Sequence, residues 1–331
     1  MVLGVRWNVD EDHIVLDIQK SLTTADVGSL MKRHIAVSKF YNPLGLLSPI
    51  IIKMNLFLQK VCLATVGWDD ELSDELKKKW KLLFEELRDS DTVRMPRYYL
   101  AGVQEEVKSY RLCGFGDASK GAYARVVYLL VETSIGFTLR IVGAKTRVAP
   151  TQILTIPRFE LLAALLLARL VHSITESLNS EMELFMSTCY TDAKVALHWI
   201  LVVKRSWKMF VQNRVNEIRK LVPKTQWRHC AGMSNPADLP SRGVSPGELK
   251  STNLWFNGPD GLAQGIMEDK PELEMPDKCI VEMKDKLFES DESTCCLTVT
   301  EEVGCHRSLS VRVTVTKEIH TCHVQHASLY Q

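Results

Sequence analysis

Four acidic side chains, Asp117, Glu160, Asp192 and Asp238, stand where predicted strands end or predicted helices begin. Asp117 and Asp192 each follow an apolar segment with strand character, whereas Glu160 and Asp238 lie in the first turns of predicted helices. Each has an ordinary explanation by itself, as a turn residue, a helix cap or a partner of the helix dipole. Taken together, carboxylates from separate elements can meet at one edge of a sheet.

Glu160 is the least ordinary of the four, because the helix around it is almost wholly apolar from Phe159 to Leu167. A helix that is hydrophobic all round is buried, and a buried carboxylate is costly unless it is paired or binds a cation. Hard oxygen ligands favour Mg²⁺ or Mn²⁺, and two such ions about 4 Å apart can activate water and stabilise the leaving oxygen in phosphodiester cleavage. We therefore predict a site for two divalent ions.

The elements that would hold these carboxylates follow the order βββ-α-β-α-α-β-α between residues 110 and 245. This order predicts an α/β fold with a mixed sheet flanked by helices. We expect strands at 112–115, 122–131, 137–144, 184–191 and 225–229, and helices at 157–178, 193–203, 207–221 and 236–241.

The flanking regions have a different character. Before residue 110 the pattern predicts a hairpin at 2–18 and then mainly helical structure, followed by a linker at 89–96. Beyond about residue 245 the pattern weakens, and we expect a linker and a poorly ordered tail with one strand. The predicted regions are 1–109, 110–245 and 246–331; the predicted flanking helices are 24–39, 50–65 and 71–88, and the tail strand is 308–315.

Composition limits the function classes. The chain has 331 residues and a formal net charge of +1, so a nucleic-acid-binding face must come from local clustering. Nine cysteines at irregular spacings predict reduced thiols and an intracellular protein, cytoplasmic or nuclear. We recognise no signal peptide, and the apolar run at 161–171, which Arg169 interrupts, is too short to span a bilayer. We expect no membrane partner.

Basic residues are concentrated between 204 and 228, with Trp207 and Trp227 interleaved. Such a cluster is typical of a face that neutralises phosphates. The alternative is an amphipathic helix with a solvated basic face and tryptophans that anchor the core. Lys145 and Arg147 could add contacts. The residues predicted to contact nucleic acid are Arg158, Lys194, Lys204, Arg205, Lys208, Arg214, Arg228 and Arg242.

Cysteines and histidines between 305 and 326 could suggest zinc, but they include no C-x2-C pair and fit no standard finger. We therefore predict no zinc site there.

Four segments resemble the four blocks of the ribonuclease H domain in Bel/Pao retrotransposon polyproteins. They are CGFGDAS at 113–119, TIPRFELLAA at 155–164, YTDAK at 190–194 and NPADLPSR at 235–242. The resemblance implies a ribonuclease H-like five-stranded mixed sheet, with the four carboxylates as ligands of two Mg²⁺ or Mn²⁺ ions. The implied substrate is the RNA strand of an RNA–DNA hybrid, cleaved during reverse transcription.

The resemblance continues upstream. LGVRW at 3–7 resembles the end of a reverse transcriptase palm, and the segments at 41–49, 67–69 and 95–97 resemble the thumb and connection that follow it. The resemblance thus implies a polyprotein fragment whose partners are the remaining reverse transcriptase and an integrase. The catalytic aspartate pair of the palm is absent from this sequence, so we expect no DNA polymerisation.

Two other functions stay open. Ala124 replaces a glycine that is usual in the family, Ala193 replaces a frequent serine, and the loop at 229–234 lacks a proline before Gly232. These departures would suit an inactive remnant that binds nucleic acid. The region has also been described as a Pao-type aspartic peptidase, but such enzymes need D-[ST]-G loops, which this sequence lacks.

Overall fold

The computed structural model describes residues 6–16, 42–64, 70–88, 92–151, 154–263 and 275–283. The chain divides into two units, Met1–Met283 and Lys284–Gln331. All of the described residues belong to the first unit. The predicted helix at 24–39, the predicted strand at 308–315 and the cysteines and histidines between 305 and 326 lie outside them.

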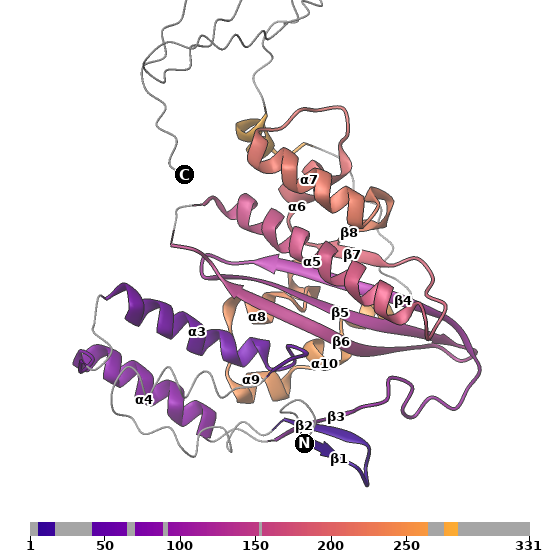
Figure 1. Ribbon diagram of the computed structural model, residues 1–331, viewed down its shortest axis with the longest axis horizontal. Helices are drawn as coiled ribbons and strands as arrows, with labels where there is room; N and C mark the ends of the chain where they lie inside the picture. The colour runs from indigo at the N-terminus through magenta and orange to yellow at the C-terminus, as the bar shows by residue number, and fades with distance from the viewer. Residues whose placement is uncertain are drawn as a thin grey trace, which may run out of the picture. The chain divides into compact units, whose positions relative to one another are not determined.

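A five-stranded mixed sheet forms the centre of the unit, in the order β6-β5-β4-β7-β8 (Figure 1). The three long strands are antiparallel neighbours, and β7 and β8 run parallel to β4. This arrangement, flanked by helices, confirms the predicted fold class. The strands are β4 (Val107–Ala118), β5 (Ala122–Thr133), β6 (Phe137–Val148), β7 (Thr188–Thr191) and β8 (Trp227–His229).

Helices cover both faces of the sheet, as Figure 1 shows. One face carries α5 (Ile156–Leu178), α6 (Lys194–Leu201) and α7 (Met209–Leu221); the other carries α3 (Ser48–Leu63), α8 (Asp238–Arg242), α9 (Pro246–Ser251) and α10 (Leu254–Asn257). Strand β5 is buried almost throughout because its alternate residues face the two layers. Val127 and Leu129 join the core beneath α5, whereas Val126 and Tyr128 join the core shared with α3.

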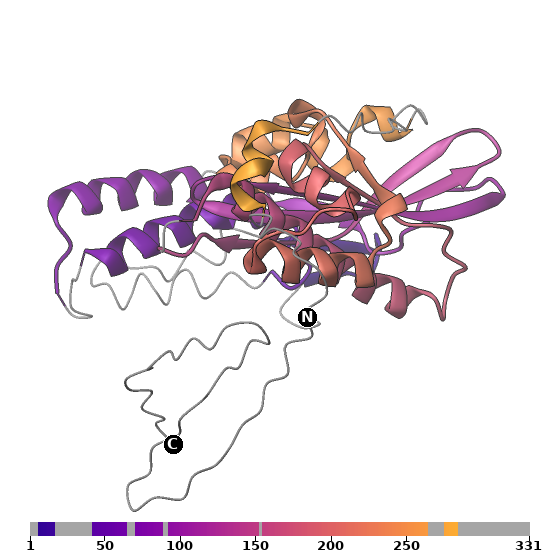
Figure 2. The same cartoon turned by 90° about the horizontal axis from the view of Figure 1, so that it is seen from above.

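The region before residue 110 supports the sheet. Strands β1 (Arg6–Asn8), β2 (His13–Leu16) and β3 (Val93–Pro96) form a separate antiparallel sheet. Helix α4 (Asp74–Arg88) lies beside α3, with the rings of Phe57 and Trp80 5.3 Å apart (Figure 2). The predicted hairpin and both described helices are present, but the predicted linker at 89–96 contains β3. The boundaries at residues 109 and 245 stay predictions.

The expected linker and tail from residue 246 need correction. Residues 246–263 form three short helices, α9, α10 and α11 (Asp260–Ala263), and residues 275–283 contain the 3-10 helix η3 (Asp277–Glu282). Trp255 is fully buried and donates a hydrogen bond to the carbonyl of Leu46, 2.8 Å away. The polar composition concealed these short elements because one tryptophan and a few aliphatic residues suffice to anchor them.

Two other details differ from the sequence predictions. The strand predicted at 184–191 is regular only as β7, and Leu184 forms a single bridge with Tyr110. The strand predicted at 225–229 begins with the 3-10 helix η1 (Lys224–Gln226) and is regular only as β8. Helix α5 is long and apolar enough, by length and composition alone, to cross a membrane. In the structure its apolar face packs on β4 and β5.

Candidate active site

The register of the central strands brings Asp117 and Asp192 together. Gly116 of β4 pairs in parallel with Thr191 of β7, so the next residue of each chain segment lies at the same edge of the sheet. Asp117 is 6% exposed at the end of β4, and Asp192 is partly buried immediately after β7. Adjacent parallel strands thus deliver two carboxylates to one place, as their positions in the sequence predicted.

Glu160 reaches this edge because α5 packs closely on β4. A Cβ atom at Gly114 would lie 2.7 Å from Leu167 Cδ1, and one at Gly116 would lie 3.5 Å from the carbonyl oxygen of Ala163. The two glycines of β4 therefore allow the close approach of the helix. Glu160, in the first turns of α5, is placed near Asp117 and Asp192 and interacts electrostatically with both.

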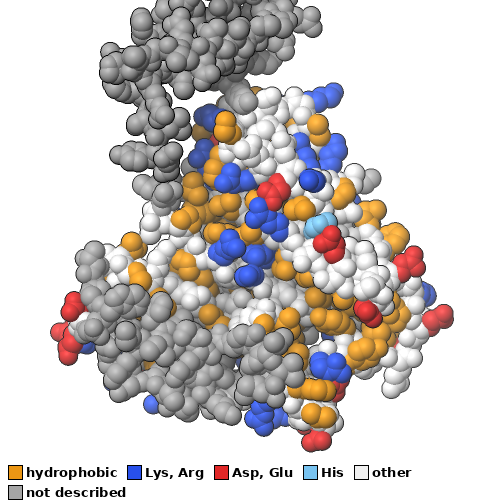
Figure 3. All heavy atoms as spheres, in the orientation of Figure 1, with side chains coloured by type: hydrophobic (Ala, Val, Ile, Leu, Met, Phe, Trp, Pro, Cys, Tyr) orange, Lys and Arg blue, Asp and Glu red, His pale blue; other side chains and the backbone are white. Residues whose placement is uncertain are grey.

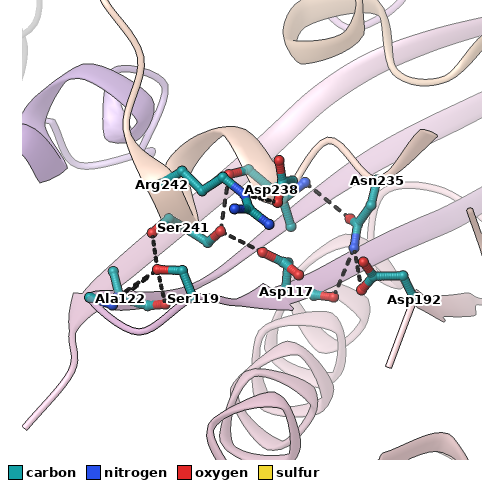
Figure 4. Close-up of polar contacts among 11 residues, drawn as sticks. Asp117, Ser119, Ala122, Asp192, Asn235, Asp238, Ser241 and Arg242 are labelled. Carbon is teal, nitrogen blue, oxygen red and sulfur yellow. Dashed lines mark hydrogen bonds and ion pairs between the residues drawn. The ribbon is translucent and has the colours of Figure 1, made fainter. Parts of the chain in front are cut away.

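Asp238 comes from the other side of the sheet, at the first residue of α8. Ser241, one turn later, donates a hydrogen bond to Asp117, and its own carbonyl accepts one from Ser119 at 2.7 Å (Figure 4). These bonds join α8 to the end of β4. We call Asp117, Glu160, Asp192 and Asp238 the carboxylate edge.

Asn235 links Asp192 to the end of β4, one residue before Asp117. It is fully buried, and its amide donates hydrogen bonds to the carbonyl oxygen of Gly116 at 3.2 Å and to Asp192 Oδ1 at 3.3 Å (Figure 4). Its own side-chain oxygen accepts from the backbone of Ala237 at 3.1 Å. Asn235 and Ser241 were not among the predicted site residues. Their position in the block at 235–242, on both sides of Asp238, was the available signal.

The carboxylates repel one another. Burial, followed by the charges of Asp192 and Asp238, raises the pKa of Asp117 to about 6, against the opposing hydrogen bond from Ser241. Burial and the charges of Asp192 and Asp117 raise the pKa of Glu160 to about 7. Without a cation, both groups therefore hold protons at pH values where an ordinary carboxyl group is ionised.

The donor chemistry fits Mg²⁺ or Mn²⁺, because the edge supplies only carboxylate oxygens close to amide and hydroxyl groups. Within the described part of the chain, however, no three Asp, Glu, His or Cys side chains are already gathered so that they could hold a metal ion. Instead, the aspartates are held individually: Asp117 by Ser241, Asp192 by Asn235 and, at 2.5 Å, Asp238 by Arg242. Mutual repulsion favours this separation.

Several of the predicted nucleic-acid contacts are engaged within the protein. Arg158 forms a two-pronged ion pair with Glu282, at 2.6 and 3.1 Å, and lies over the ring of Phe210. Arg205 contacts Met275 and Met283. The backbone N–H of Lys208 donates to the carbonyl of Glu282 at 2.8 Å. Segment 275–283 therefore engages the side chains of Arg158 and Arg205, whereas the side chain of Lys208 is exposed.

The remaining predicted contacts vary in exposure. Lys194 and Lys204 are exposed, and Arg242 is exposed beside Asp238. Arg214 lies 3.5 Å over the ring of Phe210, and Arg228 donates to backbone carbonyls. Trp207 and Trp227 are fully buried in the core beneath α5, which supports the alternative that they are core anchors.

A family comparison bears on this site. Residues 31–193 match the model of one family, the Pao retrotransposon-like RNaseH-like domain. The Pao-type resemblance is confirmed over this segment. It contains Asp117, Glu160 and Asp192, whereas Asp238 lies beyond its end. Among curated proteins, none matches the chain.

Solved structures similar to this chain include three RNase H proteins. The N-terminal RNase H domain of a Mycobacterium tuberculosis protein, fused to maltose-binding protein, has 8% identity and a TM-score of 0.29, covering 40% of this chain and 95% of that one. RNase H1 of Halobacterium salinarum has 10% identity and a TM-score of 0.23, and the match covers 49% of this chain and 100% of that one. LC11-RNase H1, in complex with an RNA/DNA hybrid, has 9% identity and a TM-score of 0.26, and the match covers 43% of this chain and 99% of that one. These TM-scores are too low to support an argument. The ribonuclease H-like fold is therefore assigned from the family match and the strand order of the sheet.

Proposed function

We propose that the chain is a retrotransposon-derived ribonuclease H that hydrolyses the RNA strand of an RNA–DNA hybrid with two divalent metal ions. The carboxylate edge is the observation that supports this most strongly. Four carboxylates from β4, α5, α8 and the end of β7 are electrostatically linked at one edge of a mixed sheet. A structural role alone would not favour so many mutually repelling charges at one edge.

Asp117, Glu160, Asp192 and Asp238 would hold Mg²⁺ or Mn²⁺ in this proposal. The bound ions would supply an activated water and stabilise the charge that develops on the leaving oxygen. Ser241 and Asn235 act as positioning residues, because they fix the orientation of Asp117 and Asp192 through hydrogen bonds. The raised pKa values of Asp117 and Glu160 have burial as their first cause, and a cation would favour their ionised forms.

The nucleic-acid partner would contact the exposed Lys194 and Lys204. Lys194 begins α6, immediately after the carboxylate edge, and Lys204 lies in the loop between α6 and α7. Arg158 could join them only after exchanging Glu282 for a phosphate. The reverse transcriptase and integrase of the same polyprotein stay proposed partners, on the strength of the family resemblance.

The test is hybrid cleavage by the full chain. The purified protein is incubated with Mg²⁺ and an RNA–DNA hybrid labelled on the RNA strand. We expect cleavage of the RNA strand, none of duplex DNA, and loss of cleavage with a chelator. Asp192→Asn should abolish cleavage, and Glu181→Gln, which removes an exposed carboxylate from a loop, should not. Binding without cleavage by the parent chain would contradict the proposal.

A second candidate is an inactive nucleic-acid-binding remnant, and the separated carboxylates favour it. In that case the chain binds the hybrid, and Mg²⁺ does not alter its unfolding temperature. The family substitution at Ala124 does not by itself distinguish the two candidates, because this residue is 1% exposed and fits between Asp117 and Thr146 in the sheet. Aspartic peptidase activity stays the least supported alternative, since no D-[ST]-G loop is present.

A further inference from the structure

Arg125 occupies an unusual position for an arginine. It lies inside β5, paired with Gly116 on one side and Lys145 on the other, and is only 6% exposed. Its Nε and Nη1 atoms are buried and have no hydrogen-bond partner among the described residues. Buried charge is costly unless an anion compensates it. Among the described residues, no hydrogen bond therefore compensates the burial of these two nitrogens.

A pocket of about 310 Å³ lies on the α5 face of the sheet. Arg125 does not line this pocket, but two of its lining residues, Arg147 and Arg169, interact electrostatically with Arg125. Arg125 faces this side because Val127, two residues later in the same strand, packs beneath α5. We call this the arginine pocket; its floor and walls include Leu162, Leu165, Leu166, Arg147, Arg169 and Arg214. Figure 3 shows Lys and Arg side chains gathered on this face, near α5.

Positive charge exceeds negative charge at the pocket. Of the described residues that line it, only Glu217 is acidic, and Glu217 is paired with Arg169 at 2.6 Å. Arg147 and Arg169 both repel the charge of Arg125, and burial together with these charges lowers the pKa of Arg125 to about 10. Arg214 is also partly desolvated, and its Nε has no partner among the described residues. The charge of Glu217 is therefore shared with Arg169, and the described lining of the pocket carries an excess of positive charge.

The geometry points to a phosphate group as the ligand of the arginine pocket. Guanidinium groups present several N–H donors in a planar array that matches phosphate oxygens. The leucine floor favours a ligand whose remainder is less polar than its anion, as in a sugar phosphate. A nucleotide and the backbone of a nucleic acid strand both have this chemistry. This inference does not depend on hydrolysis at the carboxylate edge.

The pocket is separate from the carboxylate edge but close to it. Arg125 pairs with Gly116, the residue directly before Asp117. Tyr123 lines the pocket, and its ring lies 6.3 Å from that of Phe159 in the first turn of α5, next to Glu160. A strand whose phosphate is at the carboxylates could therefore place a neighbouring phosphate among the arginines.

The first experiment measures thermal unfolding of the full chain against inorganic phosphate, with sodium chloride of equal ionic strength as the reference. We expect a saturable rise in Tm of about 2 °C or more. Arg147→Gln, which removes a lining side chain, should abolish this rise, and Arg125→Met, which removes a nearby charge, should reduce it. Arg147 is exposed, so its variant tests the pocket even if Arg125→Met perturbs folding. Lys220→Gln, on the exposed side of α7, is the matched control and should retain it.

The second experiment identifies the source of the phosphate. Affinity for an RNA–DNA hybrid is measured at several salt concentrations with the parent chain and Arg147→Gln. A strand phosphate in the pocket predicts a salt slope smaller by about one in the variant. An unchanged slope, with the phosphate effect on Tm still lost, assigns the pocket to a free nucleotide or phosphate.

General salt effects are separated by the variants. Phosphate stabilises many proteins by exclusion from their surface, and this effect would be the same in all variants. If Arg125→Met, Arg147→Gln and the parent chain all gain the same Tm in phosphate, the inference is wrong.

Discussion

The carboxylate edge and the arginine pocket concentrate charges of opposite sign a short distance apart on the same sheet. Their responses to burial differ. Asp117 and Glu160 can take up protons, because their pKa values rise to about 6 and about 7. Arg125 remains charged at neutral pH even with its pKa lowered to about 10. A proton or a metal ion can therefore reduce the repulsion between the carboxylates, whereas only an anion can reduce the repulsion between the arginines.

The largest expected effect separates catalysis from stability at the acidic site. Asp117→Asn removes a buried charge and still offers an oxygen to Ser241. We expect hybrid cleavage to fall by about 100-fold or more, while the Tm without divalent ions at pH 8 rises. Cleavage rates and thermal unfolding of the same preparations measure both. A variant that loses activity and stability together would indicate that Asp117 only supports the fold.

The pH dependence of stability tests the same acidic site without substrate. A raised folded-state pKa stabilises the protein fully below the unfolded-state value, and this contribution is lost as pH rises through the folded-state value. For Asp117 and Glu160, the loss falls mainly between pH 4 and about 7. We expect the metal-free chain to lose about 3 kcal/mol of unfolding free energy between pH 5 and pH 8.

Mg²⁺ provides the complementary measurement. It should raise the unfolding free energy more at pH 8 than at pH 5, since it competes with protons for the same oxygens. Denaturant titrations at both pH values, with and without Mg²⁺, measure this difference. Asp117→Asn should reduce both the pH slope and the Mg²⁺ effect. An equal Mg²⁺ effect at the two pH values would argue against metal binding at the carboxylate edge.

A smaller effect is expected at the basic site when no anion is present. Arg125→Met replaces a buried cation with an apolar side chain of similar length; two nitrogens of this cation have no hydrogen-bond partner among the described residues. In phosphate-free buffer we expect the variant to be more stable by about 1 kcal/mol, since such replacements are often stabilising. Urea unfolding of the variant and the parent chain gives the value. A loss of several kcal/mol would mean that Arg125 has a partner within the protein and would remove the contrast with the acidic site.

The sequence predicted the carboxylate edge better than the basic contacts, for a physical reason. Strand ends and helix starts follow from local periodicity, so Asp117, Glu160 and Asp192 could be placed at one edge. Whether a basic side chain is free to bind nucleic acid depends on partners that are distant in the sequence. Arg158 is held by Glu282, which is 124 positions away in the sequence. The burial of Arg125 likewise depends on strands and helices that pack around it.

Local patterns also missed the elements after residue 245. Helices α9, α10 and α11 have four to six residues each, which is too short for a helical period to be recognised. Their stability comes from tertiary contacts, such as those of the buried Trp255. Asn235 and Ser241 were missed because a hydrogen bond to a carboxylate leaves no periodic signal. The family block at 235–242 indicated a role for Asp238 but not for Asn235 or Ser241.

The smallest expected effect concerns segment 275–283. There the carboxylate of Glu282 is paired with Arg158, which the sequence predicted to bind a phosphate. Glu282→Gln removes the charge that holds Arg158 but keeps the size of the side chain. If Arg158 binds the hybrid, we expect affinity to rise about threefold, because the phosphate no longer displaces an ion pair. Equilibrium binding at a fixed salt concentration measures this change, with Glu181→Gln as the charge-matched control. Reduced affinity would instead mean that Glu282 orients Arg158 for binding, and the double variant with Arg158→Gln would then show no further loss.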